Sequence, residues 1–273
     1  MDPVPSEQWI RDRKTELGYK VHVVKDKPQL NDVMKKNRVL HLKWKKKRFP
    51  TAHSREAIKY FDQTWKGGKD EVLRFEARDG DDIPDSVAFR PVQSETTTQH
   101  VKVMFGAMIG TWYKGSKGWL QEIEWADALN KKGGKAKGIN AEVMRPLWKL
   151  MHTAAKKSTP PGLTPFLLLD RAPAHTAKAT AAELDCVWGK DNWALLPAKS
   201  PDLTLTDAAL FPNMERNIQK HGATTKDEIR VAVKRVWDEL TPETIAAMEK
   251  RLLRNEAEVI KRHGGNFYDE SRL

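Results

Sequence analysis

The chain has 273 residues, of which 39% are hydrophobic, so it is long enough to bury a full core. No apolar run approaches the roughly 18 residues that a membrane span needs, and the first residues lack the charged-then-apolar pattern of a secretion signal. The single cysteine, Cys186, cannot form an internal disulfide, and no Cys/His cluster indicates zinc. We therefore expect a globular protein without a membrane partner, nuclear in a eukaryotic host and cytoplasmic otherwise.

Positive charge is concentrated in the first quarter of the chain. Residues 1–69 contain 18 Lys and Arg against 8 Asp and Glu, a net charge of +10, whereas the whole chain carries +11. A segregated basic segment is typical of a nucleic-acid contact, although a solvated helix face can have the same composition. We predict that the densest run binds DNA through Lys43, Lys45, Lys46, Lys47 and Arg48.

The N-terminal part is predicted to be helical. The pattern favours a short helix over residues 6–18, with Ser6 as N-cap, and a very basic helix from Asn31 to about Lys47. A looser helical stretch is expected from Ser54 to Trp65, before Gly67-Gly68. We interpret residues 1–69 as a basic helical arm and residues 70–273 as the main domain, which has a helical C-terminus.

The character of the sequence changes after this arm. Three β-rich runs predict antiparallel strands at Glu71–Ala77, Ser86–Gln93 and Val101–Trp112. A Gly/Lys loop at residues 131–138 is followed by a helix, a strand, a helix and a strand, expected at Asn140–Lys156, Phe166–Leu169, Thr176–Trp188 and Trp193–Leu196. Helix starts at Thr225 and Thr241 complete an α/β order with a mixed sheet, which is the order of the ribonuclease H-like fold.

Two acidic residues follow apolar runs of this domain. Asp170 comes directly after the strand expected at Phe166–Leu169, and Asp207 opens a helix after a proline-containing turn. This order brings both carboxylates to one edge of the sheet, where carboxylates plus substrate phosphate can hold Mg²⁺. Each acid alone is equally consistent with a helix N-cap.

The surroundings of these acids resemble mariner-type DDE/D transposases. Leu169-Asp-Arg-Ala-Pro-Ala-His-Thr176 is similar to the family's Asp-Asn-Ala-Pro-x-His turn, and Ser200-Pro-Asp-Leu-Thr-Leu-Thr-Asp207 to the segment that ends in its third acid. Thirty-six residues separate the two acids, close to the family spacing. Val103–Ile109 and the segment from Leu210 to Thr225 extend the resemblance.

The resemblance implies metal-dependent cleavage and transfer of DNA strands by a ribonuclease H-like catalytic domain. Two ions, Mg²⁺ or Mn²⁺, would be held by three acids, with Asp170 second and Asp207 third. Register within the run Glu71–Ala77 assigns the first acid to Glu76, with Asp79, Asp81 and Asp82 as alternatives. The implied partner is double-stranded DNA, as transposon ends and target, and the chain could be a homodimer.

The sequence also departs from the family pattern. Arg171 replaces an asparagine beside the second acid, and we predict that it contacts DNA phosphate together with His175. Most of the helix-turn-helix region that the family places before the catalytic domain is not recognisable in this sequence. Two other functions therefore stay open: a catalytically decayed or domesticated transposase that only binds DNA or a partner, and a stand-alone ribonuclease H-like nuclease.

Overall fold

The structure is a computed structural model. It describes residues 13–14, 16–17, 19–23, 25–66, 74–78, 89–92, 103–123, 141–220, 223 and 225–268. The chain forms two compact units, one from Met1–Gln29 with Lys69–Thr98 and the other from Leu30–Gly68 with Gln99–Leu273. Most of the helix expected over residues 6–18, and the whole loop expected over residues 131–138, lie outside the described residues.

The smaller unit contains two pairs of short strands. β1 (Tyr19–Val23) pairs antiparallel with β4 (Arg74–Arg78), and β2 (Lys25–Pro28) pairs parallel with β5 (Phe89–Val92). Two of the strands expected from the sequence are therefore present, but they lie outside the main sheet.

The larger unit is built on a five-stranded sheet with the order β7-β6-β3-β8-β9. Its strands are β3 (Ile58–Lys66), β6 (Val103–Tyr113), β7 (Ser116–Glu122), β8 (Phe166–Leu169) and β9 (Trp193–Leu195). The first three pair antiparallel, and β8 and β9 continue the sheet in parallel with β3. The expected mixed sheet, antiparallel strands followed by parallel ones, is confirmed.

Helices surround this sheet. They are α2 (Asp32–Arg48), α3 (Ala52–Arg55), α5 (Ala141–Lys157), α6 (Pro173–Thr176), α7 (Lys178–Trp188), α8 (Phe211–Lys220), α9 (Lys226–Asp238) and α10 (Pro242–Lys261), with a 3₁₀ turn η1 (Pro201–Leu203) and a π-helix η2 (Thr206–Leu210). Asn31 caps α2 by accepting from the Met34 N–H at 2.9 Å, and Thr225 and Glu228 form the expected capping box of α9. Within the described residues, no helix is both long enough and apolar enough to cross a membrane.

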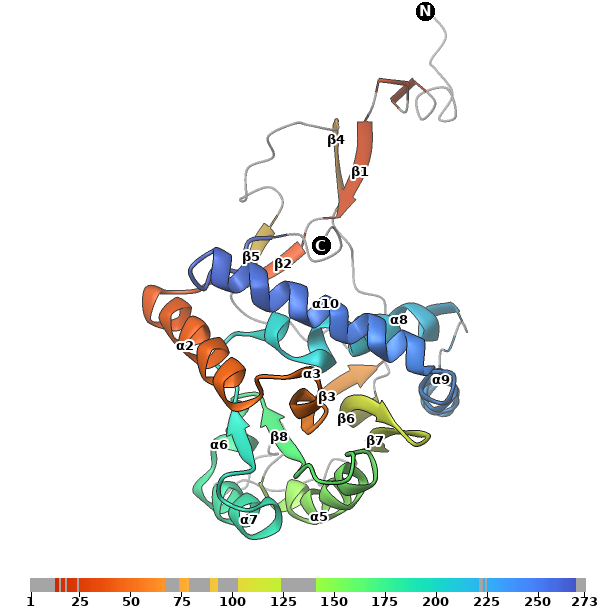
Figure 1. The fold of residues 1–273 in the computed structure, drawn as a ribbon. Coiled ribbons are helices and arrows are strands. Elements are labelled where there is room, and N and C mark those ends of the chain that lie inside the picture. Colours follow the sequence, from red (N-terminus) through yellow and green to blue (C-terminus); the bar gives the residue numbers. More distant parts are fainter. Residues whose placement is uncertain are drawn as a thin grey trace, which may run out of the picture. The chain divides into compact units, whose positions relative to one another are not determined.

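Alternation along the strands divides the core into two layers. On β8, Phe166 and Leu168 pack with η2, α8, α9 and α10, whereas Leu167 and Leu169 pack with α5 and α7. Figure 1 shows α10 and α8 on one side of the strands and α5 and α7 on the other. The side chains of consecutive residues in a central strand therefore contact opposite helical layers. This alternation determines on which face of the sheet each residue of the candidate site lies.

The sequence reading of residues 54–69 is wrong in two respects. Ser54–Trp65 is predominantly strand β3 rather than helix, and β3, not Glu71–Ala77, is the first strand of the five-stranded sheet. In addition, α2 and β3 belong to the same compact unit as the rest of the sheet, so the division of the chain does not follow the expected boundary at residues 69 and 70.

A buried ion pair joins Arg38 of α2 to Asp202. The guanidinium of Arg38 donates to both carboxylate oxygens of Asp202, at 2.7 and 2.6 Å, and both side chains are at most 3% exposed. Arg38 Nε also donates to the carbonyl of Gly264 at 2.8 Å, and the Tyr268 hydroxyl donates to Asp202 at 2.6 Å. Asp202 belongs to the Ser-Pro-Asp-Leu segment before the third acid, so this ion pair fixes that segment to α2 and to the C-terminal part of the unit.

Candidate active site

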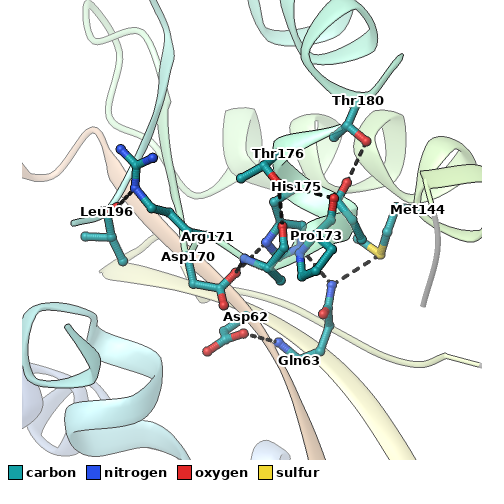
Figure 2. Close-up of polar contacts among 12 residues, drawn as sticks. Asp62, Gln63, Met144, Asp170, Arg171, Pro173, His175, Thr176, Thr180 and Leu196 are labelled. Atoms are coloured by element: carbon teal, nitrogen blue, oxygen red, sulfur yellow. Dashed lines mark hydrogen bonds and ion pairs between the residues drawn. The ribbon is translucent and has the colours of Figure 1, made fainter. Parts of the chain in front are cut away.

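The register of two parallel strands brings two acids side by side. Phe61 of β3 pairs with Leu169 of β8, so the next residues, Asp62 and Asp170, follow at the same edge of the sheet. Figure 2 shows Asp62 close to Asp170. Asp62 belongs to β3, a strand in the stretch Ser54–Trp65 for which the sequence predicts a helix.

The third acid comes from the π-helix. Asp207 lies in η2, which packs on the face of β3 that carries Ile58 and Tyr60. Asp62 is two residues after Tyr60 in the strand, so it lies on that same face. The side chains of Asp62 and Asp207 are close enough to interact directly. Burial, and then the negative charges of Asp207 and Asp170, raise the pKa of Asp62 well above its ordinary value, although the Gln63 N–H donates to Asp62 Oδ1 at 2.7 Å. Three carboxylates from three elements therefore act on one another electrostatically.

Asp170 is held in place by donors. Its Oδ1 atom accepts from the Ala172 N–H at 3.1 Å and lies 2.5 Å from His175 Nδ1. Burial raises the pKa of Asp170, but the hydrogen bond and the electrostatic interaction of His175, and then the hydrogen bond of the Ala172 N–H, outweigh it and lower the pKa below the ordinary value. The charged form of Asp170 is therefore favoured.

His175 lies on the opposite face of the sheet from Asp207. Its ring is 0% exposed and contacts the rings of Phe61 and Trp148, with centroid distances of 5.7 and 5.9 Å. Its Nε2 atom lies 2.9 Å from the side-chain amide of Gln63. The prediction that His175 contacts DNA is wrong, because this ring is enclosed by protein.

Glu76 does not belong to the five-stranded sheet. Glu76 lies in β4, opposite Val21 of β1, in the smaller compact unit. Its assignment as first acid rested on Glu71–Ala77 being the first strand of the main sheet, which is wrong. The alternatives Asp79, Asp81 and Asp82 lie outside the described residues. The residue that sequence reasoning missed is Asp62.

The three acids have the ligand chemistry that suits a hard divalent cation. The site offers carboxylate oxygens only, which suit Mg²⁺ or Mn²⁺, and the raised pKa of Asp62 reflects burial and then repulsion by its acidic neighbours, which a cation would relieve. Within the described residues, however, no group of three or more His, Cys, Asp or Glu side chains is placed to hold one ion together. The carboxylates thus lie close to one another without forming a complete metal cage.

The basic run on α2 is divided between surface and core. Lys43, Lys46 and Lys47 are exposed. Lys45 is 4% exposed and donates to the Tyr60 hydroxyl at 2.6 Å and to Glu256 of α10. Burial would lower the pKa of Lys45, but Tyr60 and Glu256 outweigh it and raise the pKa. The prediction that Lys45 binds DNA is wrong, because its charge is neutralised within the core.

The two arginines of the predicted DNA contact also bind the protein. Arg48 is exposed, but it donates to the Asp191 carbonyl at 2.5 Å and lies over the Phe166 ring, 4.8 Å from its centroid. Arg171 donates through Nε to the Leu196 carbonyl at 2.9 Å (Figure 2) and makes no ion pair with a described residue. Arg171 therefore leaves the acid cluster open and keeps its charge at the surface.

A cavity of about 510 Å³ lies beside Arg171. It is lined by the start of α2 and by the segment after β9, including Asn37, His41 and Pro197. Burial, and then the charges of Lys45 and Arg171, lower the pKa of His41 to about 4, so this imidazole is neutral at physiological pH. The positive charge lining this cavity therefore comes from Arg171.

Because the carboxylates are crowded, we expect neutralising Asp62 to increase the stability of the fold by an amount that depends on pH. Because the folded-state pKa of Asp62 is raised above 3.8, the folded state binds more protons than the unfolded state, and stability falls as pH rises through the folded pKa. In EDTA, Asp62→Asn should therefore raise the Tm at pH 8, and the gain should shrink towards pH 4. A lower Tm than that of the parent at pH 8 would contradict the arrangement of the site.

Comparison with known proteins bears on the fold. The sequence matches no protein-family model and no curated protein. The Mos1 mariner paired-end complex with Mn is similar in structure, with a TM-score of 0.64 and 18% identity over 96% of this chain and 72% of that chain. The catalytic domain of Mos1 mariner transposase gives 0.61 and 16% over 89% of this chain and 99% of that chain. The Mos1 strand transfer complex gives 0.60 and 18% over 96% and 71%. The chain therefore has a mariner-type transposase fold, with the ribonuclease H-like sheet of the Mos1 catalytic domain.

Proposed function

We propose that this chain is a metal-dependent DNA strand-cleaving and strand-transferring enzyme whose acids are Asp62, Asp170 and Asp207. The observation that carries the proposal is their convergence from β3, the end of β8 and η2 at one edge of the sheet. In-line phosphoryl transfer needs charge held in position rather than a reactive side chain, and three carboxylates on separate elements supply that.

The three acids have different tasks in this proposal. Asp62 of β3 and Asp207 of η2 would hold one cation between them, and Asp170 would complete the site from the end of the next strand. Bound Mg²⁺ or Mn²⁺ stabilises the attacking and leaving oxygens of a phosphoryl transfer. Structures of the Mos1 paired-end complex that contain Mg or Mn support the choice of ion.

Double-stranded DNA is the proposed substrate. Among the residues predicted for this contact, the exposed cations Lys43, Lys46, Lys47 and Arg171 remain available, and Arg171 follows the second acid directly. The similar Mos1 structures include a paired-end complex with the left transposon end, which supports DNA as the ligand of this fold. We assign to Arg171 the role of contacting DNA phosphate next to the second acid.

A second candidate function is DNA binding without catalysis. It is favoured by the observation that the described residues form no three-ligand metal group. In that case the acids would be the remnant of a site that no longer binds a catalytic metal.

Nicking of supercoiled plasmid separates the two functions. The parent should convert supercoiled to open-circular DNA with Mg²⁺ or Mn²⁺ and not with EDTA, and Asp170→Ala should not. Asp185→Ala is a matched control, because Asp185 lies on α7 and bonds the Trp193 indole at 2.8 Å, away from the acids. Plasmid binding without nicking by the parent would establish the non-catalytic function.

The exposed lysines should control the salt dependence of DNA binding. Changing Lys43, Lys46 and Lys47 to Gln should reduce the slope of log K against log salt by about 0.9 for each phosphate that the variant no longer neutralises. Changing Lys45 alone should leave the slope unchanged and lower the Tm instead, since its ammonium group is buried against Tyr60 and Glu256. An unchanged slope in the triple variant would remove α2 from the DNA contact.

A further inference from the structure

We propose that Gln63 and His175 are positioning residues that hold Asp170 in the orientation its function requires. The inference rests on the proposed function, since it assigns Asp170 to the metal site. Four side chains form the chain of contacts: Met144, Gln63, His175 and Asp170 (Figure 2).

The thioether of Met144 decides which way the Gln63 amide points. Gln63 Nε2 lies 3.3 Å from Met144 Sδ and 2.9 Å from His175 Nε2. Sulfur in a thioether has no proton and can only accept, so the amide atom facing it must be the NH₂ group. The second N–H of that group then points at His175.

The amide in turn decides the tautomer of His175. Because Gln63 donates to Nε2, this nitrogen must be the acceptor of a neutral ring, and the ring proton must be on Nδ1. Nδ1 then donates to Asp170 Oδ1, 2.5 Å away. The orientation of one amide is thus transmitted through the imidazole to the carboxylate.

The result is a carboxylate with one oxygen engaged and one available. Oδ1 of Asp170 accepts from His175 and from the Ala172 N–H, whereas Oδ2 has no hydrogen-bond partner among the described residues. Partners that orient a ligating carboxylate in this way matter to metal sites nearly as much as the ligands. His175 therefore fixes which oxygen of Asp170 faces the acid cluster.

Gln63 connects two of the acids. Its backbone N–H donates to Asp62 Oδ1 at 2.7 Å, on one face of β3, while its side chain acts on Asp170 through His175 from the other face. The strand alternation that separates the two core layers makes this possible, because consecutive residues point in opposite directions. A shift of Gln63 would disturb both carboxylates.

The surroundings of His175 prevent water from replacing these contacts. The ring is 0% exposed and is enclosed by Phe61 and Trp148. A buried amide or imidazole that loses its partner remains unsatisfied, so the four residues are expected to keep one arrangement.

Metal affinity of the full chain tests the positioning role. Mn²⁺ binding, followed through the electron paramagnetic resonance signal of free Mn²⁺, should weaken about 10- to 100-fold in Gln63→Leu and His175→Gln. His175→Asn should weaken binding less than His175→Gln, because an asparagine amide reaches the position of Nδ1 although it loses the contact with Gln63. His152→Gln, which replaces a histidine of α5 that contacts Trp188 and none of the four residues, is the matched control.

The tautomer provides a readout independent of metal. In ¹⁵N-labelled protein in EDTA, the His175 signal, assigned by its absence in His175→Asn, should show a pyrrole-type Nδ1 and a pyridine-type Nε2. A protonated Nε2 would overturn the proposal.

The binding series distinguishes the positioning role from the proposed function. If Asp170→Asn weakens Mn²⁺ binding while Gln63→Leu and His175→Gln match the parent, the positioning role is overturned and the proposed function stands. If the parent itself does not bind Mn²⁺, the proposed function fails and the positioning role fails with it.

Discussion

Asp62→Asn should abolish metal-dependent nicking, whereas Glu76→Gln should nick like the parent. The amide keeps the shape of Asp62 but removes the charge that, with Asp207, would hold the cation. Even a displacement of about 1 Å at a catalytic group can cost on the order of 10²-fold, so loss of a ligand should cost at least that much. Glu76 lies in β4, which pairs with β1 and not with the five-stranded sheet that leads to the other acids.

The measurement is plasmid nicking with Mg²⁺ or Mn²⁺, with Tm in EDTA as the check on folding. The Asp62→Asn variant should be inactive while melting at or above the temperature of the parent at pH 8, which excludes unfolding as the cause. Full activity of Asp62→Asn together with an inactive Glu76→Gln would restore the assignment of Glu76 as first acid.

Most elements from α5 onward could be predicted because their local signals agree with their structure, whereas strand β7 was not predicted. Phe166–Leu169 is a continuous apolar run of the kind that a buried parallel strand requires, and all four side chains are at most 2% exposed. The helix starts at Thr225 and Thr241 carry side chains that cap the first turn. Such elements are recognisable from sequence because their apolar residues are buried and their capping residues cap a helix.

β3 could not be recognised for the opposite reason. Ile58, Phe61 and Trp65 recur at three- and four-residue spacing, which resembles one face of a helix. The alternation expected of a strand is hidden by Lys59, which is 0% exposed and bonds the Ser158 carbonyl at 2.7 Å, and by Asp62 itself. Buried charge at these positions is a property of the site and of tertiary contacts, which local patterns do not contain.

The same limit applies to the basic run. All four of these residues are lysines, yet the helix places Lys45 towards α10 and the other three, Lys43, Lys46 and Lys47, towards solvent. Charge density predicts a basic surface, but only the orientation of α2 decides which side chains belong to it.

Arg38→Met should destabilise the larger unit by about 3–5 kcal/mol, the usual cost of removing one partner from a buried ion pair. Asp202 would keep the Tyr268 hydroxyl as a donor but would lose both guanidinium bonds inside the core. The Gly264 carbonyl would also lose its bond from Arg38 Nε. Denaturant unfolding of the parent and the variant measures the change.

A matched surface pair and a double variant make this test specific. Arg230 binds Glu122 through two bonds of 2.8 Å, but it is exposed, so Arg230→Met should change stability little, because solvent screens exposed charges. Arg38→Met with Asp202→Leu should be less destabilised than the sum of the single variants, since no uncompensated charge remains buried. Additive effects would show that Arg38 stabilises the unit through its bond to Gly264 and its packing rather than through Asp202. Because Asp202 lies five residues before Asp207, loss of the pair should also weaken Mn²⁺ binding at temperatures where the variant is still folded.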